Sequence, residues 1–383
     1  MAFFYAVARP PVRSRFDRGF SSSLATAGLL IGLLTGCGQP TTGGTAGGRA
    51  DTGDAVASPI DRRKLCKRID AVLAHARDDR RLDASVHGAW QVVHGILAFG
   101  RDFPLRHDGT DSAALDYLLD GGRLTGWNLR TGSPGVIALL EEGSNTGQGH
   151  PDQWLGYLSQ CGRQGIPRDT KLVVGKKTSF TVNDLLTQAQ ADIRPGREAT
   201  WTLMALSAYL PIDATWTASD GTKWNTERVV QMEADADIVT SACGGAHRLY
   251  GLVAALKKHR AATGHTPEQL SGGWAAAQEV IDECVDRARR FQQADGSFSI
   301  HSFERPGTSA DVFAKLSATG HIFEVLSLSL DDEQLSEPWV TRAADRLVTM
   351  LEQTADVDVE CGCLYHAAHG LLLYSDRVCG STE

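Results

Sequence analysis

The segment HAAHGL, residues 366–371, is the last of six similar segments that decide how this chain folds. The other five are QVVHGI (91–96), DQWLGY (152–157), WTLMAL (201–206), HRLYGL (247–252) and HIFEVL (321–326). The fifth position of this frame is Gly or Ala in every segment except HIFEVL, where Val325 occupies it. Self-similarity at intervals of several tens of residues is typical of repeat folds. The six segments therefore predict six structural repeats.

A charged, amphipathic segment precedes or follows each apolar one. These charged segments cover residues 60–78, 111–120, 182–192, 224–240, 274–293 and 336–354. Charged helices can face water, whereas the apolar helices must be buried between them, and small residues at position five let the buried helices approach closely. The sequence therefore predicts an all-α fold, an (α/α)6 toroid of six inner and six outer helices. Residues 171–182, KLVVGKKTSFTV, are the one stretch expected to form a small hairpin.

This pattern resembles the α/α toroid of the terpene cyclase and protein prenyltransferase superfamily over residues 60–380. The segments FQQADGSFS (291–299) and ACGGAHRLYGLVAAL (242–256) carry the resemblance most directly. The resemblance implies a central cavity with an apolar, isoprenoid-like ligand. The catalytic signatures differ, because EADAD (233–237) lacks the adjacent acid pair of class II cyclases and Ala368 stands where lanthionine cyclases place a zinc-binding cysteine.

The first 58 residues have a different composition from the repeats. A basic region with four arginines precedes an apolar stretch, LATAGLLIGLL (24–34), which is too short to span a bilayer and is typical of a signal peptide. Leu34-Thr35-Gly36-Cys37 resembles the bacterial lipobox, which implies a signal peptide over 1–36 and lipidation of Cys37 with fatty acids such as palmitate. Residues 37–58 are rich in Gly, Thr and Ala and are expected to form a flexible tether, followed by one domain over 59–383. An ordinary secretory signal with an incidental Cys37 is the alternative.

Charge and cysteine content restrict the partners and the compartment. The formal charge is −8, and removing a leader with four Arg and one Asp gives −8 − 4 + 1 = −11. An acidic body without a basic cluster argues against nucleic acid as a partner. Seven cysteines remain after Cys37, so at least one is unpaired. The expected location is the bacterial cell envelope, attached by lipid to the periplasmic side of the outer membrane more than to the inner membrane, since Gly38 follows Cys37.

Histidines and carboxylates gather at two positions of the six-fold frame. Position one contains Asp152, His247, His321 and His366, and position four contains His94, Glu324 and His369. In a toroid these residues are expected to line the site at one mouth of the central cavity. His321 and Glu324 lie one helical turn apart, as a base and the carboxylate that orients it would.

Three interpretations of these residues stay open. Each imidazole could be hydrogen-bonded within the core, because buried polar groups are normally satisfied. The cluster could instead perform general acid/base catalysis, because histidine titrates near neutral pH. A zinc ion is the third possibility, with Cys363, His366 and His369 as candidate ligands. Cys361 and Cys363 would point to opposite sides of an extended segment, so they are not expected to bind the same ion. Cys243 pairs poorly with His247 on spacing alone, although residues i and i+4 share a helix face.

The sequence leaves open whether the protein is an enzyme. The leading hypothesis is an envelope lipoprotein whose His-rich cavity binds and transforms an apolar ligand. The alternatives are a non-catalytic toroid that binds an envelope protein or a glycan, and a polysaccharide-degrading toroid. Trp90, Trp127, Trp154 and Trp201 could line a sugar-binding cavity, although such residues are more often core.

Overall fold

The computed structural model describes residues 60–140, 152–162, 165–175 and 177–380. Residues 58–383 form one compact unit. The predicted signal peptide, the lipidation of Cys37 and the tether all fall outside the described residues. Within the described part of the chain, no helix has the length and apolar character needed to cross a membrane.

The described residues are mostly helical with only small sheets, so the helix-rich part of the all-α prediction is confirmed. The helices are α1 (Arg62–Ala74), α2 (Ala89–Phe99), α3 (Ala114–Leu119), α4 (Gln153–Gln160), α5 (Val182–Asp192), α6 (Thr200–Tyr209), α7 (Thr226–Ala234), α8 (Ala246–Thr263), α9 (Gly272–Phe291), α10 (Val312–Ser329), α11 (Asp332–Leu335), α12 (Pro338–Gln353) and α13 (Cys361–Val378). Five of the six apolar segments lie wholly within helices, namely α2, α6, α8, α10 and α13, and the sixth begins at Asp152, the N-cap of α4.

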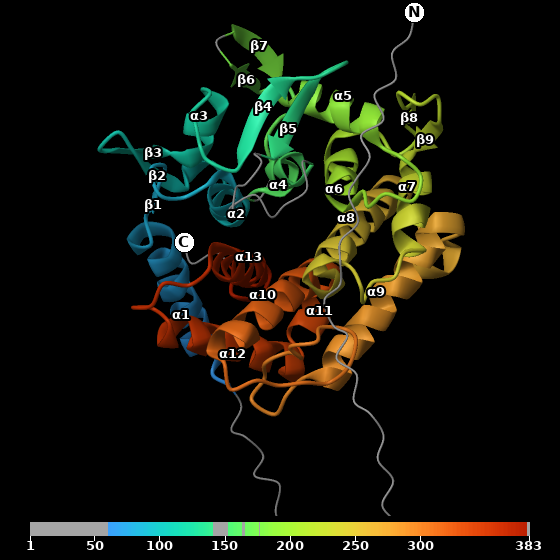
Figure 1. Ribbon diagram of the computed structural model, residues 1–383. Helices are drawn as coiled ribbons and strands as arrows, with labels where there is room; N and C mark the ends of the chain where they lie inside the picture. Colours follow the sequence, from blue (N-terminus) through green and yellow to red (C-terminus); the bar gives the residue numbers. More distant parts are fainter. Residues whose placement is uncertain (1–59, 141–151, 163–164, 176, 381–383) are drawn as a thin grey trace, which may run out of the picture. The chain divides into compact units, whose positions relative to one another are not determined.

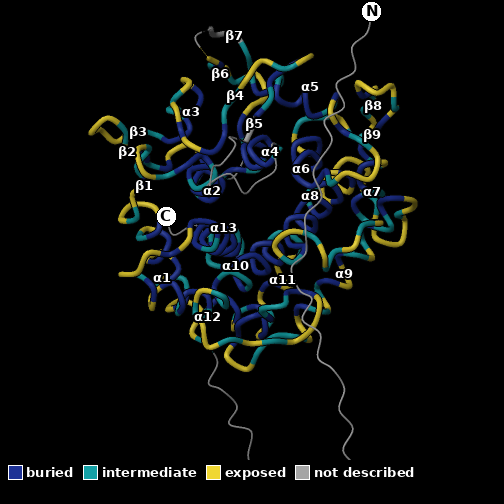
Figure 2. The backbone as a smooth tube through the Cα atoms, in the orientation of Figure 1, coloured by how far each residue is buried: buried dark blue, intermediate teal, exposed yellow. Residues whose placement is uncertain are grey.

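The apolar helices contact one another in a closed order. In this order α2 packs against α4, α4 against α6, α6 against α8, α8 against α10, α10 against α13, and α13 against α2. The charged helices α1, α3, α5, α7, α9 and α12 pack outside them (Figure 1). Burial follows the six apolar segments, which are almost entirely buried, whereas exposed residues gather on the charged helices, on the loops and at the C-terminal end of α8 (Figure 2).

Glycines in the apolar helices permit these close contacts. A Cβ atom on Gly370 of α13 would lie 2.8 Å from the backbone nitrogen of Glu324 in α10. A Cβ atom on Gly320 of α10 would lie 3.1 Å from Ala367 of α13. Because real Cβ atoms essentially never approach other atoms within 3.0 Å, Gly370 sets how near α10 and α13 can come.

The described residues also contain four small sheets. The strands are β1 (Leu82–Asp83), β2 (Pro104–His107), β3 (Thr110–Ala113), β4 (Trp127–Thr131), β5 (Val136–Leu140), β6 (Lys171–Val174), β7 (Lys177–Thr181), β8 (Thr215–Thr217) and β9 (Lys223–Asn225). β6 and β7 pair antiparallel, which confirms the hairpin predicted over 171–182. The prediction that this would be the one hairpin was wrong, since β2–β3, β4–β5 and β8–β9 also pair antiparallel.

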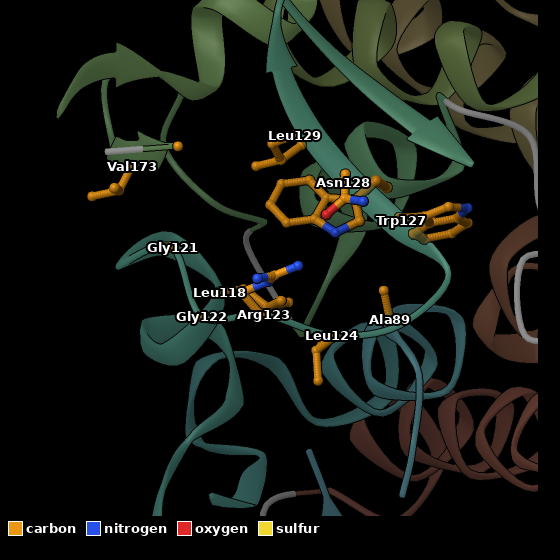
Figure 3. A pocket seen from close by; sticks show the side chains of 12 residues that line it. Ala89, Leu118, Gly121, Gly122, Arg123, Leu124, Trp127, Asn128, Leu129 and Val173 are labelled. Carbon is orange, nitrogen blue, oxygen red and sulfur yellow. The ribbon is translucent and has the colours of Figure 1, made fainter. Parts of the chain in front are cut away.

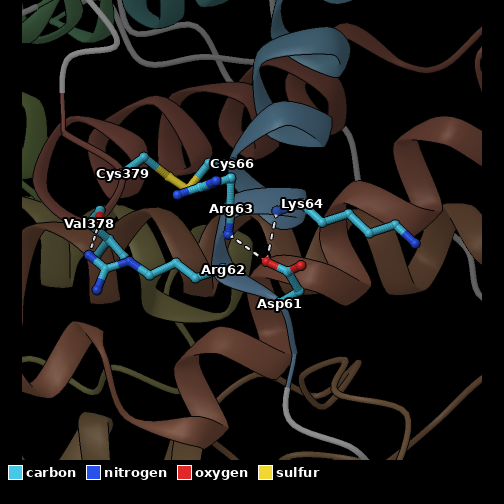
Figure 4. The surroundings of a disulfide bond; sticks show 7 residues. All are labelled: Asp61, Arg62, Arg63, Lys64, Cys66, Val378 and Cys379. Atoms are coloured by element: carbon cyan, nitrogen blue, oxygen red, sulfur yellow. Dashed lines mark hydrogen bonds between the residues drawn. A yellow bond between two sulfur atoms is a disulfide. The ribbon is translucent and has the colours of Figure 1, made fainter.

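A disulfide joins the first helix to the last. Cys66 of α1 is bonded to Cys379, the residue that caps α13, across 313 residues of sequence (Figure 4). The Arg62 guanidinium donates a hydrogen bond to the Val378 carbonyl at the same contact. The described chain is therefore closed covalently where the first and last helices meet.

Candidate functional site: a buried histidine cluster that reaches the surface at Cys243

Five imidazoles from four of the apolar helices gather in the core. His94 comes from α2, His247 from α8, His321 from α10, and His366 and His369 from α13. The ring centroids of His321 and His366 are 4.1 Å apart, and those of His247 and His366 are 5.0 Å apart. All five side chains are buried. The structure thus brings together the histidines that the repeat frame placed at positions one and four.

Glu324 is bound between two of these histidines. Its Oε2 accepts a hydrogen bond from His366 Nδ1 at 2.8 Å, and its Oε1 accepts one from His369 Nδ1 at 2.6 Å. Desolvation by itself would raise the pKa of this buried carboxyl, but the two histidines hold it well below its usual range. Glu324 is therefore an anion in the core, only 1% exposed.

The predicted pairing of His321 with Glu324 is not what the structure contains. Although the two residues lie one turn apart, the Nδ1–H group of His321 donates to the Ser317 carbonyl at 2.8 Å, and Glu324 binds the histidines of α13. The reason is that α10 and α13 approach closely at Gly370, which brings the neighbouring helix within reach of this carboxylate.

Cys243 lies where the cluster reaches the surface. It precedes α8 in an unusual backbone turn, because Cys243, Gly244 and Gly245 all have left-handed conformations with φ of 52°, 63° and 88°. A cysteine rarely adopts this conformation, and such strained residues gather at functional sites. Cys243 therefore does not share a helix with His247, and the turn instead brings its thiol near the start of α8.

Cys243, His247 and His321 form a group that can hold a metal ion. Each offers one ligand atom, and these atoms lie within 4.8 Å of one another. Among the described residues, no other group of three His, Cys, Asp or Glu side chains meets this condition. Sequence reasoning named His247 and His321 as site residues and considered Cys243 only as a poor partner for His247. The signal for Cys243 was the Gly-Gly pair that follows this cysteine directly before a helix.

The other candidate residues have different surroundings. Cys363, His366 and His369 do not form such a group; Cys361 and Cys363 lie in the first turn of α13, so the extended segment expected there was wrong. Asp152 accepts a hydrogen bond from Thr202 and lines a separate cavity of about 340 Å³. Glu233 of the EADAD segment is buried in an ion pair with Arg248, so it is a structural residue.

Protonation at Cys243 differs from that of an ordinary thiol. Desolvation would raise the pKa of Cys243, but His247 and His321 lower it to about 5. Desolvation would likewise lower the pKa of His321, but the Cys243 thiolate raises it to about 9. Burial dominates for His366 and lowers its pKa to about 3, so this imidazole is neutral. In the absence of a metal, Cys243 and His321 form a thiolate–imidazolium pair.

A cavity of about 470 Å³ opens beside Cys243 and His321. Its lining combines apolar and polar side chains, including Val239, Ile300, His301, Ser302, Glu304 and Ser317. Ser302 also has a left-handed backbone, with φ of 49°, and a Cβ atom on Gly244 would lie 2.2 Å from its hydroxyl oxygen. The cavity therefore gives a ligand direct access to the exposed end of the cluster.

A second cavity, of about 390 Å³, lies near the start of α2 (Figure 3). Trp127 of β4 and Trp154 of α4 both line it, together with Arg123 and Asn128. The other two tryptophans expected at a cavity lie beside the histidines, because the Trp90 ring is tilted against His94 and the Trp201 ring is tilted against His247.

Comparison with known proteins gave no match. No family model, no curated protein and no solved structure matches this chain. The function must therefore be inferred from the site itself.

Proposed function

We propose that this protein is a zinc-dependent hydrolytic enzyme on an α/α toroid, with the metal held by Cys243, His247 and His321. The observation that carries the proposal is the convergence of three ligand atoms within 4.8 Å beside an open cavity. The closed order of contacts among α2, α4, α6, α8, α10 and α13 supports the toroid.

The chemistry of the donor atoms fits zinc. Zinc prefers thiolate sulfur and imidazole nitrogen, and catalytic zinc sites have three protein ligands and an open fourth position. His321 donates its Nδ1–H group to a carbonyl, so Nε2 is the nitrogen that would lose its proton and bind the ion. Such a hydrogen bond from the second ring nitrogen is typical of metal-binding histidines.

Charge balance supports a dication at the same place. Glu324 is an anion in the core, and its hydrogen-bond partners are the imidazoles of His366 and His369. A buried charge without a counter-charge costs several kcal/mol. A divalent cation bound by one thiolate retains one positive charge, which would compensate Glu324.

The site residues would have separate roles in hydrolysis, some binding the metal ion and others binding the substrate. A zinc ion held there would supply Lewis-acid chemistry, that is, activation of water and polarisation of a carbonyl or phosphoryl oxygen. Cys243, His247 and His321 would hold the ion at the edge of the cavity. The lining of Ile300, His301, Ser302 and Glu304 would bind the substrate. An isoprenoid-like substrate stays a prediction.

Metal analysis of the full-length protein, purified without chelator, tests this proposal. We expect about one equivalent of zinc, lost in Cys243→Ser and in His321→Ala and retained in the matched control Cys363→Ser. Zinc-loaded protein is expected to hydrolyse p-nitrophenyl acetate, and a chelator should abolish this activity. Wild-type protein that binds no zinc even after its addition would overturn the proposal and favour Cys243 and His321 as a metal-free nucleophile and base.

We propose further that Cys37 anchors this enzyme to the periplasmic side of the outer membrane. The lipobox-like segment 34–37 and the Cys66–Cys379 disulfide support export to an oxidising compartment. Cys37→Ser should release the protein from the membrane fraction without changing its zinc content. Continued membrane association of that variant would contradict lipid anchoring.

A further inference from the structure

We infer that His366 and Glu324 form a hydrogen-bonded relay behind the metal centre, in which His247 binds the ion through Nδ1 and donates its Nε2–H group to His366. This inference rests on the proposed metal site and assigns positioning roles to two residues that do not touch the ion.

The hydrogen-bond partners of Glu324, His366 and His247 determine which ring nitrogen of each histidine carries a proton. An ionised carboxylate only accepts hydrogen bonds, so Glu324 requires a proton on Nδ1 of both His366 and His369. Nε2 of His366 lies 3.2 Å from Nε2 of His247, so one of these two nitrogens donates to the other. Nδ1 of His247 has no other partner, and a nitrogen that binds a metal ion uses its lone pair and carries no proton. The proton between the two rings therefore belongs to Nε2 of His247.

The other ring nitrogen of His247, Nδ1, is the atom that remains open to the ion. Among the described residues, Nδ1 of His247 is buried without a hydrogen-bond partner. His247 is the second residue of α8, directly after the turn that places Cys243. The unsatisfied nitrogen is thus the ligand atom that the site requires.

The hydroxyl group of Tyr157 lies beside three of these histidines, and its hydrogen bonds are compatible with the relay. Its hydroxyl oxygen lies 3.3 Å from Nε2 of His366, 3.4 Å from Nε2 of His247 and 3.5 Å from Nε2 of His94. His94 donates from Nδ1 to the Trp90 carbonyl, so its Nε2 can accept the one hydroxyl proton. Gln153 donates to the Tyr157 oxygen at 3.1 Å. Each proton of the cluster then has one acceptor.

The relay explains why a carboxylate is buried behind the proposed metal centre. Hydrogen bonds from a ligand's second nitrogen to outer partners fix the ring and raise its basicity, and removing such partners typically weakens metal binding about 10- to 100-fold. Glu324 would act on the ion through two imidazoles, with His369 holding its other oxygen. Glu324 and His366 are therefore positioning residues.

Zinc affinity of the full-length protein, measured by chelator competition, tests the relay. Glu324→Gln should weaken zinc binding about 10- to 100-fold while still reaching one equivalent at saturation. The matched control Glu283→Gln, at an exposed carboxylate of α9, should bind zinc as the wild type does. Unchanged affinity in Glu324→Gln would overturn the relay and leave the metal site standing.

Cobalt substitution separates the relay from direct ligation by His366. In the cobalt-loaded His366→Gln variant we expect the thiolate-to-cobalt absorption and the coordination number to match the wild type. A changed coordination number would mean that His366 is itself a ligand and would overturn the relay.

A third measurement uses the wild-type protein alone, so it does not depend on whether a variant folds. Nitrogen chemical shifts of the zinc-loaded wild-type protein should place the proton of His247 on Nε2. A proton on Nδ1 would contradict the relay. Failure of the wild type to bind any metal would overturn the proposed function itself, so the two failures are distinguishable.

Discussion

Cys243 shows how a single residue joins backbone conformation to chemistry. Three consecutive left-handed residues end the loop before α8, and two of them are glycines that adopt this conformation at no cost. The turn places the thiol beside His247 and His321, at the edge of a cavity. No periodic pattern in the sequence indicates such a turn, and this is why Cys243 was not among the predicted site residues.

The thiolate character of Cys243 predicts its reactivity in metal-free protein. Because His247 and His321 lower its pKa to about 5 against the desolvation that would raise it, alkylation by iodoacetamide should reach half its maximum near pH 5 and stay high above that. Peptide mapping by mass spectrometry measures this for each cysteine.

Cys363 is the internal control for that experiment. Desolvation raises its pKa to about 12, so it should stay unmodified at neutral pH. A half-maximal rate for Cys243 near pH 9, the value of an ordinary thiol, would show that the two histidines do not stabilise the thiolate.

At the scale of helices, hydrophobic patterning predicted much of the structure. The charged segment 182–192 coincides with α5, and 336–354 matches α12 within two residues at its start and one at its end. These helices each have one apolar face, which a single sequence reveals directly. The small sheets were mostly missed because strands as short as β8 have too few residues to show alternation.

The sequence predicted which residues belong to the candidate site, but it did not predict their hydrogen-bond partners. The repeat frame collected His247, His321, Glu324, His366 and His369, and the structure gathers them in one core. Which imidazole binds Glu324 depends on the approach of α10 to α13, and that approach follows from contacts distant in sequence.

The close approach of α10 and α13 predicts the cost of adding one methyl group. Gly370→Ala should lower the free energy of unfolding by about 2–3 kcal/mol, because its Cβ would meet the backbone of α10 at 2.8 Å. Gly320→Ala should cost less, about 1 kcal/mol, because its nearest contact is 3.1 Å. Urea unfolding followed by circular dichroism gives both values, and equal costs would argue against the backbone clash.

At the scale of the whole described unit, one disulfide bond joins residues near its two ends. The Cys66–Cys379 disulfide closes a loop of 313 residues between α1 and the end of α13. Cross-linking residues so distant in sequence removes much conformational freedom from the unfolded chain.

Loss of this bond should therefore destabilise the protein. Cys66→Ser is expected to lower the free energy of unfolding by about 2–5 kcal/mol. Thermal unfolding with and without reductant checks this, because reductant should destabilise the wild type and leave the variant unchanged. A wild type that is indifferent to reductant would show that the bond contributes little.

The same bond makes the domain a covalent circle. A protease that cuts any single loop between α1 and α13 would leave one molecule of unchanged mass, apart from one added water, and the two pieces would separate only after reduction. The order of the helices along the gene would then be only one of several equivalent orders. A chain opened between α8 and α9, with its former ends held by Cys66 and Cys379, should assemble the same helices with the same contacts.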